Sequence, residues 1–433
     1  MLGLGLARRL TAAGCEVTVI EGAPRLGGLA SSQQLGTITW DRFYHVTLLS
    51  DSALRELLGE LGLADTIQWR TTKTGFFVDG HLYPFNSAID FLRFPPLSLI
   101  DKARLGYTIL TASRISDGLP LEQILAVDWL TRLSGSRTVE RIWLPLLKAK
   151  LGENATRASA SFIWAIIARM YGARRQGLKQ EMFGYVQGGY DAVLRRLETY
   201  LTERGVEMCT GQPVESVEGD GEGATVRFGD GATRKFDAVV LTIPCSRVGA
   251  LCPQLTTDER TRLDRVVYQG IVCPSLLLDR PLAPYYVTNI TDDWVPFTAV
   301  IEMTALVDPA TFGGQHLVYL PRYLTQEAGD WKKSDAQILD ESISALERMY
   351  PGFHRGHVRA TQVSRVRNVL AVSTLDYTAS CVPPLRTSQD RVFVVNSAQI
   401  ANGTLNVNET LMLADRQARA LAPLLSAAAP AVS

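Results

Sequence analysis

The chain has 433 residues, in which 44 Lys and Arg balance 44 Asp and Glu, so its formal net charge is zero. This balance excludes the strongly basic character of nucleic-acid-binding domains, and a hydrophobic content of 46% excludes a disordered chain. The length predicts two or more domains or one large α/β body.

Cysteine usage and hydropathy predict the compartment. The six cysteines are scattered and form no C-x-x-C pair, which argues against a zinc knuckle or a disulfide framework. No uninterrupted apolar stretch reaches the length of about 18 residues that a membrane span needs, and the first residues lack a signal-peptide profile. We therefore predict a cytoplasmic protein.

The first 32 residues predict a helix, a strand and a glycine turn. Residues 2–10 carry small side chains on the early turns of a helix, and residues 16–21 form a β-rich run that ends in Glu21. The turn Arg25-Leu26-Gly27-Gly28 follows. A helix N-terminus offers N–H groups to a pyrophosphate, and a carboxylate at a strand end can accept both hydroxyls of a ribose. These residues predict a dinucleotide site; the alternative is a plain helix–strand packing unit.

This order of elements resembles the opening of the FAD-dependent amine-oxidase superfamily, which includes protoporphyrinogen oxidases, phytoene desaturases and, more distantly, UDP-galactopyranose mutases. The family has a strand, a G-x-G-x-x-G turn, a helix, a strand ending in Glu and an R-x-G-G turn. The last fingerprint glycine matches Gly3, 18 residues before Glu21. The resemblance implies that Gly3, Glu21, Arg25, Gly27 and Gly28 bind FAD. It also predicts that the chain as given is truncated, with the first strand and two glycines lying before Met1.

Residues 37–40 predict a strand that leads into Asp41-Arg42-Phe43-Tyr44-His45. In the family a stretch at this point passes close to the flavin ring, which makes Tyr44 and His45 candidates for the cofactor or substrate face. The alternative is that both are buried and hydrogen-bonded near a sheet edge. Residues 52–61 then predict a helix with Asp51 as its N-cap.

A hairpin is predicted at residues 74–84, with Asp79-Gly80 as the two-residue turn. The pattern from residue 97 to 171 is mostly helical. Residues 91–110 mix aromatics, prolines and isolated basic residues, which would suit a peripheral membrane contact. The alternative is a substrate-domain helix with its apolar side in the core, and we favour this alternative.

Glycines 188 and 189 precede a predicted helix at residues 192–201, as they do where the family returns to its cofactor domain. Strands are predicted at residues 206–210, 213–217, 224–228 and 236–244. In the family the second of these borders the adenine, which makes Val214 a cofactor-binding candidate. Further strands and a helix at residues 335–349 predict a second substrate-domain segment. His354 and His357 lack a third ligand, so no metal site is predicted.

Near the C-terminus, residues 391–395 predict a buried strand, and a helix opens after Gly403. Asn396-Ser397 stands where the family has Gly followed by an acid. The family helix directs its N-terminus at the flavin pyrimidine, where N–H groups stabilise negative charge at N1 and O2. The resemblance therefore implies that Ser397, Asn406, Val407 and Asn408 contact the cofactor.

We predict an α/β fold in which a Rossmann-like FAD-binding domain (1–80, 181–252 and 386–433) is interrupted by a mixed α+β substrate, or cap, domain (81–180 and 253–385). The resemblance implies two-electron oxidation of a small organic substrate by hydride transfer to FAD, as in protoporphyrinogen oxidases, amine oxidases and desaturases. One alternative is a mutase-like isomerase, with Arg322, Arg365 and Arg367 for a diphosphate; another is a truncated chain unable to hold FAD. Nucleic acid is not expected as a partner, and the substrate, the electron acceptor and the oligomeric state stay open.

Overall fold

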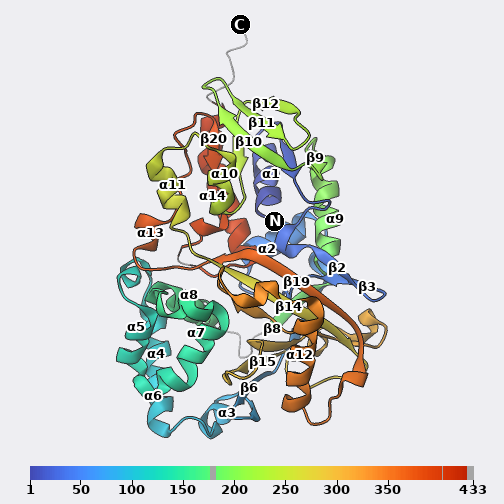
Figure 1. Cartoon of the computed structure of the whole chain (residues 1–433), viewed down its shortest axis with the longest axis vertical. Helices are drawn as coiled ribbons and strands as arrows, with labels where there is room; N and C mark the ends of the chain where they lie inside the picture. The colour runs from blue at the N-terminus through green and yellow to red at the C-terminus, as the bar shows by residue number, and fades with distance from the viewer. Residues whose placement is uncertain (176–181, 402, 427–433) are drawn as a thin grey trace.

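A computed structural model describes residues 1–175, 182–401 and 403–426. The fold mixes helices with parallel and antiparallel sheets (Figure 1), as the sequence predicts. The predicted domain boundary between residues 180 and 181 and the last seven residues of the predicted FAD-binding domain, 427–433, lie outside the described residues. The other domain boundaries stay predictions.

Two short parallel pairs form the part of the molecule that holds the first and last segments. Strand β1 (Thr18–Glu21) pairs with β9 (Glu207–Thr210), and β13 (Val239–Leu241) pairs with β20 (Val392–Val394). Among the described strands these two pairs share no hydrogen bonds with one another. An antiparallel sheet of β10 (Val214–Gly219), β11 (Ala224–Phe228) and β12 (Thr233–Phe236) covers one end of the molecule (Figure 1). The prediction of a preceding strand stays a prediction.

Four helices build one core beside these strands. They are α1 (Leu2–Ala12), α2 (Ser52–Glu60), α9 (Gly189–Thr202) and α14 (Val407–Ser426). Each contributes apolar side chains at helical spacing, and the buried cluster includes Leu4, Leu57, Leu197 and Leu411. Gly5 allows α1 to approach α14 closely, because a Cβ there would lie 3.0 Å from the Cβ of Ala414. Two further helices, α10 (Cys245–Leu251) and α11 (Thr257–Asp264), pack near β10.

An eight-stranded sheet forms the centre of the other half. Its strand β14 (Tyr268–Leu278) is buried along its whole length and pairs with β17 (His316–Tyr319), β18 (Arg322–Leu324) and β19 (Val358–Ala371). The sheet continues through β16 (Ala299–Glu302), β15 (Val287–Ile290), β6 (Thr74–Val78) and β7 (His81–Pro84). Asp79 and Gly80 join the last two strands with positive φ angles, as the predicted hairpin turn requires. Helix α12 (Asp335–Met349) packs on β14 and β19.

Smaller elements connect the two halves. The strand pair β2 (Ser32–Leu35) and β3 (Ile38–Asp41) lies beside α9, and β8 (Met182–Val186) pairs with β4 (Thr47–Leu48) and β5 (Ile67–Thr71). A short helix, α13 (Tyr377–Ser380), precedes β20. Three-residue to five-residue 3-10 turns occur at Gly28–Ala30, Ala64–Thr66, Leu119–Gln123, Gly152–Thr156, Met303–Ala305, Pro309–Phe312, Gly329–Lys332, Arg355–His357 and Ser397–Gln399.

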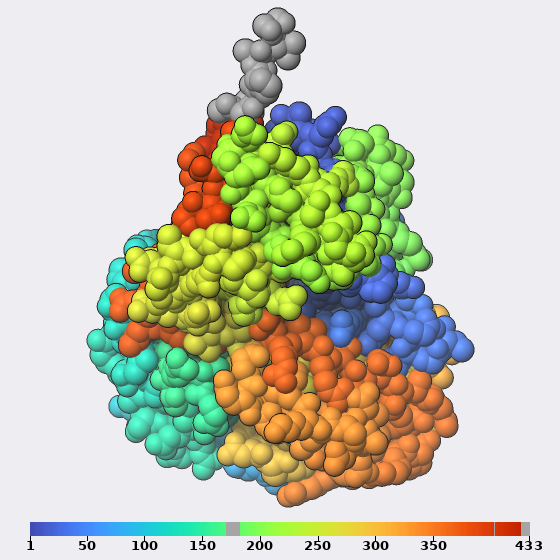
Figure 2. Space-filling model, turned by 45° about the horizontal axis from the view of Figure 1, so that its top comes forward, coloured from blue at the N-terminus to red at the C-terminus, as the bar shows by residue number. Residues whose placement is uncertain are grey.

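A helical lobe, which is mostly teal in Figure 2, lies beside the large sheet. It comprises α3 (Ala88–Arg93), α4 (Leu99–Arg114), α5 (Ala126–Ser134), α6 (Ser136–Thr138), a π-helical turn (Val139–Trp143), α7 (Leu144–Leu151) and α8 (Ala160–Arg175). Its core contains Trp129, Trp143 and Trp164. None of the helices described here combines the length and the apolar character that crossing a membrane requires.

The N-cap of α2 differs from the sequence prediction. The Asp51 side chain makes no capping bond; its Oδ2 accepts the N–H of Leu48 instead, and its Oδ1 contacts Arg169. Asn408, which follows the first residue of α14, takes the place of the cap. Its Oδ1 accepts the N–H groups of Ala53 (2.9 Å) and Leu54 (3.2 Å). The sequence pattern fails here because a residue more than 350 positions away supplies the acceptor.

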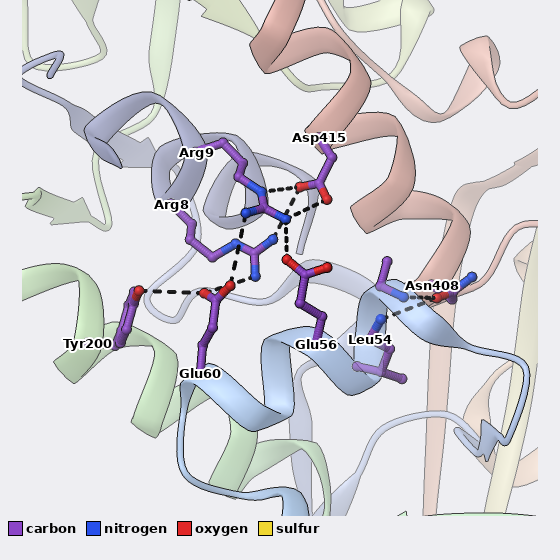
Figure 3. A network of polar contacts seen from close by, with 9 residues as sticks. Arg8, Arg9, Leu54, Glu56, Glu60, Tyr200, Asn408 and Asp415 are labelled. Carbon is purple, nitrogen blue, oxygen red and sulfur yellow. Dashed lines mark hydrogen bonds and ion pairs between the residues drawn. The ribbon is translucent and has the colours of Figure 1, made fainter. Parts of the chain in front are cut away.

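A charged network joins α1, α2 and α14 (Figure 3). The Arg8 side chain is 2% exposed, and its guanidinium lies 3.1 Å from both Glu60 and Asp415. Arg9 contacts both carboxylate oxygens of Asp415, at 2.6 and 2.7 Å, and also binds Glu56. Burial raises the pKa of Asp415, but the hydrogen bonds and charges of the two arginines outweigh it, so the net shift is downward.

We predict that Asp415→Ala lowers the free energy of unfolding by about 3–5 kcal/mol, because it leaves the buried Arg8 guanidinium without one of its carboxylates. Arg8→Met should cost less, since it removes the buried charge itself. The measurement is urea unfolding of both variants. Arg234→Met is the control, because both side chains of the Arg234–Glu207 pair are exposed, 42% and 50%, and such a pair should contribute little to stability. Arg195→Met should behave in the same way, since the Arg195 side chain is 72% exposed. Equal effects of Asp415→Ala and Arg234→Met would contradict the prediction.

Candidate functional site

The strand-end residues of the predicted dinucleotide site lie together. Glu21 ends β1, is half-buried, and its Oε1 accepts the N–H of Ala23 at 2.9 Å. The segment before Val214 runs beside it, since Gln212 donates its N–H to the Glu21 carbonyl. Val214 itself is half-buried at the start of β10. A carboxylate and a neighbouring extended backbone therefore meet at the end of a parallel strand, as a nucleoside site requires.

The turn after β1 packs against α9. Gly27 has φ 110°, and a Cβ there would lie 2.5 Å from Leu194 Cδ1, so a larger residue would displace either the turn or the helix. Gly28 also has a positive φ and opens the following 3-10 turn. Arg25 is exposed. Gly3 lies in the first turn of α1, where a Cβ would be 3.3 Å from Thr242 Oγ1.

A second group of predicted residues surrounds the start of α14. Asn406 caps this helix, because its Oδ1 accepts the N–H of Glu409 at 3.0 Å. The backbone N–H groups of Val407 and Asn408 have no acceptor within the part of the chain that the structure describes. The side-chain oxygen of Asn408 accepts from α2 and its Nδ2 donates to Met412 Sδ, whereas its backbone N–H is left for a cofactor. This helix start presents unused donors with the positive end of the helix dipole.

Asn396 and Ser397, at the end of β20, form a turn. Asn396 is buried and its Oδ1 accepts the N–H of Ala398, which caps a short 3-10 helix. Ser397 is half-buried and lines a small cavity together with Ser373, Gly403 and Leu405. The Asn396 side chain thus serves the local turn, and Ser397 faces the space next to the segment before α14.

Asp41 and His45 lie in a buried cluster against α9. Asp41 Oδ1 accepts the N–H of Tyr190 at 2.7 Å, and its Oδ2 lies 4.0 Å from His45 Nδ1, which is beyond hydrogen-bond length. Burial raises the pKa of Asp41 to about 7, against the Tyr190 hydrogen bond, while the charge of Asp191 adds to the rise. Burial lowers the pKa of His45 to about 4, so its imidazole is neutral at pH 7. The contact between them is therefore not an ion pair.

Two polar atoms of this cluster lack partners. The rings of His45 and Tyr190 lie 4.8 Å apart, and both His45 Nδ1 and the Tyr190 hydroxyl are buried without a hydrogen-bond partner among residues 1–175, 182–401 and 403–426. Burial lowers the pKa of His45, the Phe43 backbone opposes this effect, and the alternative expectation, that Tyr44 and His45 are buried and hydrogen-bonded, stays a prediction. Buried groups of this kind are normally satisfied, so the pair points to a ligand.

Tyr44 faces the large sheet. Its hydroxyl lies 2.8 Å from that of Tyr323 on β18, and the neighbouring Tyr319 hydroxyl donates to the Asp41 carbonyl. Burial raises the pKa of Tyr44 well above its ordinary value, so the phenol stays protonated. These contacts fix the loop of residues 41–45 between α9 and the large sheet.

Several residues near α14 were missed by the sequence analysis. Arg169 on α8 donates to Thr404 Oγ1 at 3.0 Å and contacts Asp51 Oδ1 at 3.1 Å. The half-buried Lys150 on α7 has its pKa lowered by burial and by the charge of Arg169. Burial raises the pKa of Glu409, on the first turn of α14. This cluster forms from residues that are far apart in the sequence, so no spacing pattern in the sequence predicts it.

Tyr190 connects the two clusters. Burial raises its pKa, and the charges of both Asp41 and Asp51 add to the rise, which places the phenol near the Asp41–His45 group and near the Asp51–Arg169 group. Of the predicted residues, His45 therefore lies in the same region as the start of α14, while Glu21, Arg25, Gly27, Gly28 and Val214 lie at the nucleotide end. Helix α9 contacts both groups, since Leu194, beside Gly27, lies one helical turn after Tyr190.

The comparisons with known proteins identify the family. The family model described as flavin-containing amine oxidoreductase matches residues 3–422, which is nearly the whole chain.

The chain belongs to this family.

It is an FAD-dependent oxidoreductase. No curated protein sequence matches the chain significantly. Among solved structures, a candidate protoporphyrinogen oxidase from Exiguobacterium sp. 255-15 has a TM-score of 0.76 at 18% identity, covering 98% of this chain and 97% of that one. Putrescine oxidase bound to putrescine has a TM-score of 0.72 at 16% identity, with 96% of each chain covered. Reduced UDP-galactopyranose mutase has a TM-score of 0.73 at 15% identity, covering 98% and 95%. At these identities the similarity shows the fold.

The residues present fit FAD. The nucleotide end offers a half-buried carboxylate at a strand end, and the ring end offers two unused N–H groups at a helix start and two unpartnered buried polar atoms. Bound FAD would supply two-electron, hydride-accepting chemistry. The surrounding side chains would orient it and set the local charge.

We predict that Asp41→Asn raises stability more near pH 8 than near pH 5. The folded-state pKa of Asp41 lies above its ordinary value of 3.8, so the folded protein binds more protons than the unfolded chain between about pH 4 and pH 7. Stability from this group therefore falls as the pH rises through that window. Asparagine keeps the acceptor for the Tyr190 N–H and does not ionise. Urea unfolding at both pH values is the measurement, with the exposed Glu222→Gln as control. A variant-minus-parent difference that is independent of pH would contradict the prediction.

Proposed function

We propose that the protein oxidises a small organic substrate by hydride transfer to FAD, and that the substrate reaches the flavin between the Tyr44–His45 stretch and the large sheet. The pair of unpartnered buried atoms, His45 Nδ1 and the Tyr190 hydroxyl, is the observation that carries this proposal. Tyr190 belongs to the same apolar cluster as Val407 at the start of α14. Orphaned polar groups and unused helix-end N–H groups in one region are what a bound polar ring system would satisfy.

Asp41 is the proposed proton-holding group, and His45 is its neutral neighbour. A carboxyl group with a pKa of about 7 can bind or release a proton at neutral pH, which an ordinary aspartate cannot do. The neutral His45 Nδ1 lies 4.0 Å from Asp41 Oδ2, too far for a direct hydrogen bond, so we assign it to hydrogen bonding with a substrate or cofactor. The sequence analysis did not identify Asp41 as a base, because its altered pKa results from burial against α9.

The role of Tyr44 is to shape the substrate face. Its hydroxyl pairs with that of Tyr323, and both phenols remain protonated because burial raises their pKa. Two aromatic side chains joined in this way give an apolar wall with one polar edge. This supports a substrate with substantial apolar surface.

The isomerase alternative receives less support. Arg322 is paired with Asp330 and Glu341, and Arg365 is paired with Asp335. Arg367 lies over the Trp331 ring and donates to the Gln326 carbonyl. The guanidinium groups named for a diphosphate are therefore already engaged.

We also propose a cytoplasmic location, because all six cysteines are unpaired.

We predict that anaerobic mixing of the FAD-loaded protein with a suitable substrate bleaches the flavin absorbance. Porphyrinogens, amines and polyenes are the classes to test, since each supplies a hydride to flavin in a net oxidation. Restoration of the absorbance on admission of dioxygen, or of another acceptor, would complete the cycle. Turnover of a UDP-sugar without consumption of an acceptor, together with no bleaching by the three classes, would contradict the proposal.

We predict that Val407→Pro lowers the reduction potential of the bound flavin and slows its reduction. Proline at the first helical position removes one N–H and leaves the helix start intact. That N–H is proposed to stabilise the negative charge that reduction places on the ring. A dye-equilibration potential is the measurement. Val407→Ala is the matched control, because it removes similar buried packing and keeps the N–H. Equal potentials in the folded, FAD-loaded proline and alanine variants would mean that this helix start does not face the flavin.

A further inference from the structure

Exposed apolar side chains gather on two helices of the helical lobe. Within the described part of the chain, nine large apolar side chains are exposed, and six of them lie on α3 and α4. Their exposed fractions range from 47% to 73%. We call them the α3–α4 surface: Ile89, Leu92, Leu99, Ile100, Tyr107 and Leu110. Scattered single apolar residues are ordinary on a protein surface, whereas a contiguous group marks an interaction site.

Helix α4 is apolar on two sides. Its inner side buries Leu105 and Ala112 against the core of the helical lobe, as the sequence analysis favoured. Its outer side repeats apolar residues at positions 99, 100, 103, 107 and 110, a helical spacing. The same spacing with polar residues would have built an ordinary solvated face. Packing in the core of the helical lobe therefore does not explain the apolar residues on the outer side of α4.

The α3–α4 surface is held in place. Each helix begins with a capping box, Ser87 with Asp90 on α3 and Ser98 with Asp101 on α4. Between the helices, Lys102 Nζ donates to the Leu92 carbonyl at 2.8 Å, at the C-terminal end of α3. The capping boxes and this hydrogen bond thus hold in place the two helices that carry the exposed apolar side chains.

The exposed charged side chains around the α3–α4 surface are positive. Arg93, Arg104 and Arg114 are exposed. Residues 85–116 contain two acids, Asp90 and Asp101, and both carboxylates are bound in the capping boxes. The aliphatic side chains and the tyrosine are therefore accompanied by three exposed arginines, of which Arg104 lies against Gly135, and by no unbound carboxylate within residues 85–116.

We propose that the α3–α4 surface binds the interface of a lipid bilayer that carries anionic headgroups. Aliphatic side chains enter the boundary between headgroups and acyl chains, tyrosine suits the same level, and long arginine side chains reach phosphates while their stems stay apolar. A second copy of this chain is a weaker occupant, because a two-fold interface would bring the arginines of the two copies together. The positive charge gives anionic lipid its preference over neutral lipid.

The location suits such a contact. Helices α3 and α4 lie at the end of the molecule away from the β10–β12 sheet and the start of β1 (Figure 1). Binding there would leave the nucleotide end in water. The proposal does not depend on the proposed oxidation, since it rests on the surface of the helical lobe.

The test is flotation of the full-length, FAD-loaded protein with two kinds of vesicle, phosphatidylcholine alone and phosphatidylcholine mixed with phosphatidylglycerol. We expect the protein to bind the mixed vesicles and to bind the neutral vesicles more weakly. Added salt should weaken binding to the mixed vesicles. The double variant Leu99→Glu, Ile100→Glu should bind at least about tenfold less, because it removes buried apolar area and adds negative charge. Arg104→Glu should lower affinity for mixed vesicles by about fivefold or more, with little change on neutral ones.

The control is Leu375→Glu, an exposed apolar residue outside the α3–α4 surface, which should bind like the parent. Circular dichroism and the flavin spectrum establish that each variant is folded. Absence of vesicle binding by the parent, or equal binding by the parent and the Leu99→Glu, Ile100→Glu variant, would overturn the proposal. Dimers in sedimentation velocity that this variant abolishes, in a protein that binds no vesicles, would assign the surface to a second copy instead.

Discussion

The buried guanidinium of Arg8 is the constraint on which the site depends. Removing an arginine from water is costly, and here carboxylates from two other helices offset that cost, Glu60 from α2 and Asp415 from α14. An arrangement in which either helix moved away would leave the buried Arg8 charge with one carboxylate in place of two. The ion pairs thus set where α1, α2 and α14 meet, over and above the non-directional packing of their leucines.

The positions of these helices also determine where backbone N–H groups without acceptors lie. Asn408 can cap α2 because α14 starts beside the first turn of α2, and the same start leaves two backbone N–H groups without acceptors among the described residues. On the other side, the Asp41 carboxyl group holds the first turn of α9 and brings Tyr190 against His45. The candidate site is therefore a junction of helix starts, each held by a side chain from a distant segment. Such a junction suits a cofactor that must be oriented by fixed dipoles.

Much of the fold could be predicted from the sequence because its signals are local. The helix at Asp335–Met349, the Asp79-Gly80 hairpin and the strand ending at Glu21 each carry their own periodicity or turn residues. The family and its cofactor followed from the order of Glu21 and the Arg25-x-Gly27-Gly28 turn. The cap of α2 could not be predicted, since Asn408 is local to α14 and distant from α2 in sequence. Asp41 was missed for a related reason: its pKa depends on burial, which no single residue encodes. For residues 91–110 the sequence analysis favoured a core role over a membrane contact, because periodicity shows an apolar face without showing what covers it; the outer side of α4 is exposed.

The central claim is that this junction holds FAD, and titration of the purified, flavin-free chain with FAD tests it most directly. The account predicts saturable binding of one FAD per chain, with the visible absorbance bands of the flavin shifted and resolved as they are in a protein site. It also predicts that binding raises the midpoint of urea unfolding, since a ligand that binds only the folded state stabilises it. A folded chain whose flavin spectrum and unfolding midpoint stay unchanged at high FAD concentration would contradict the account.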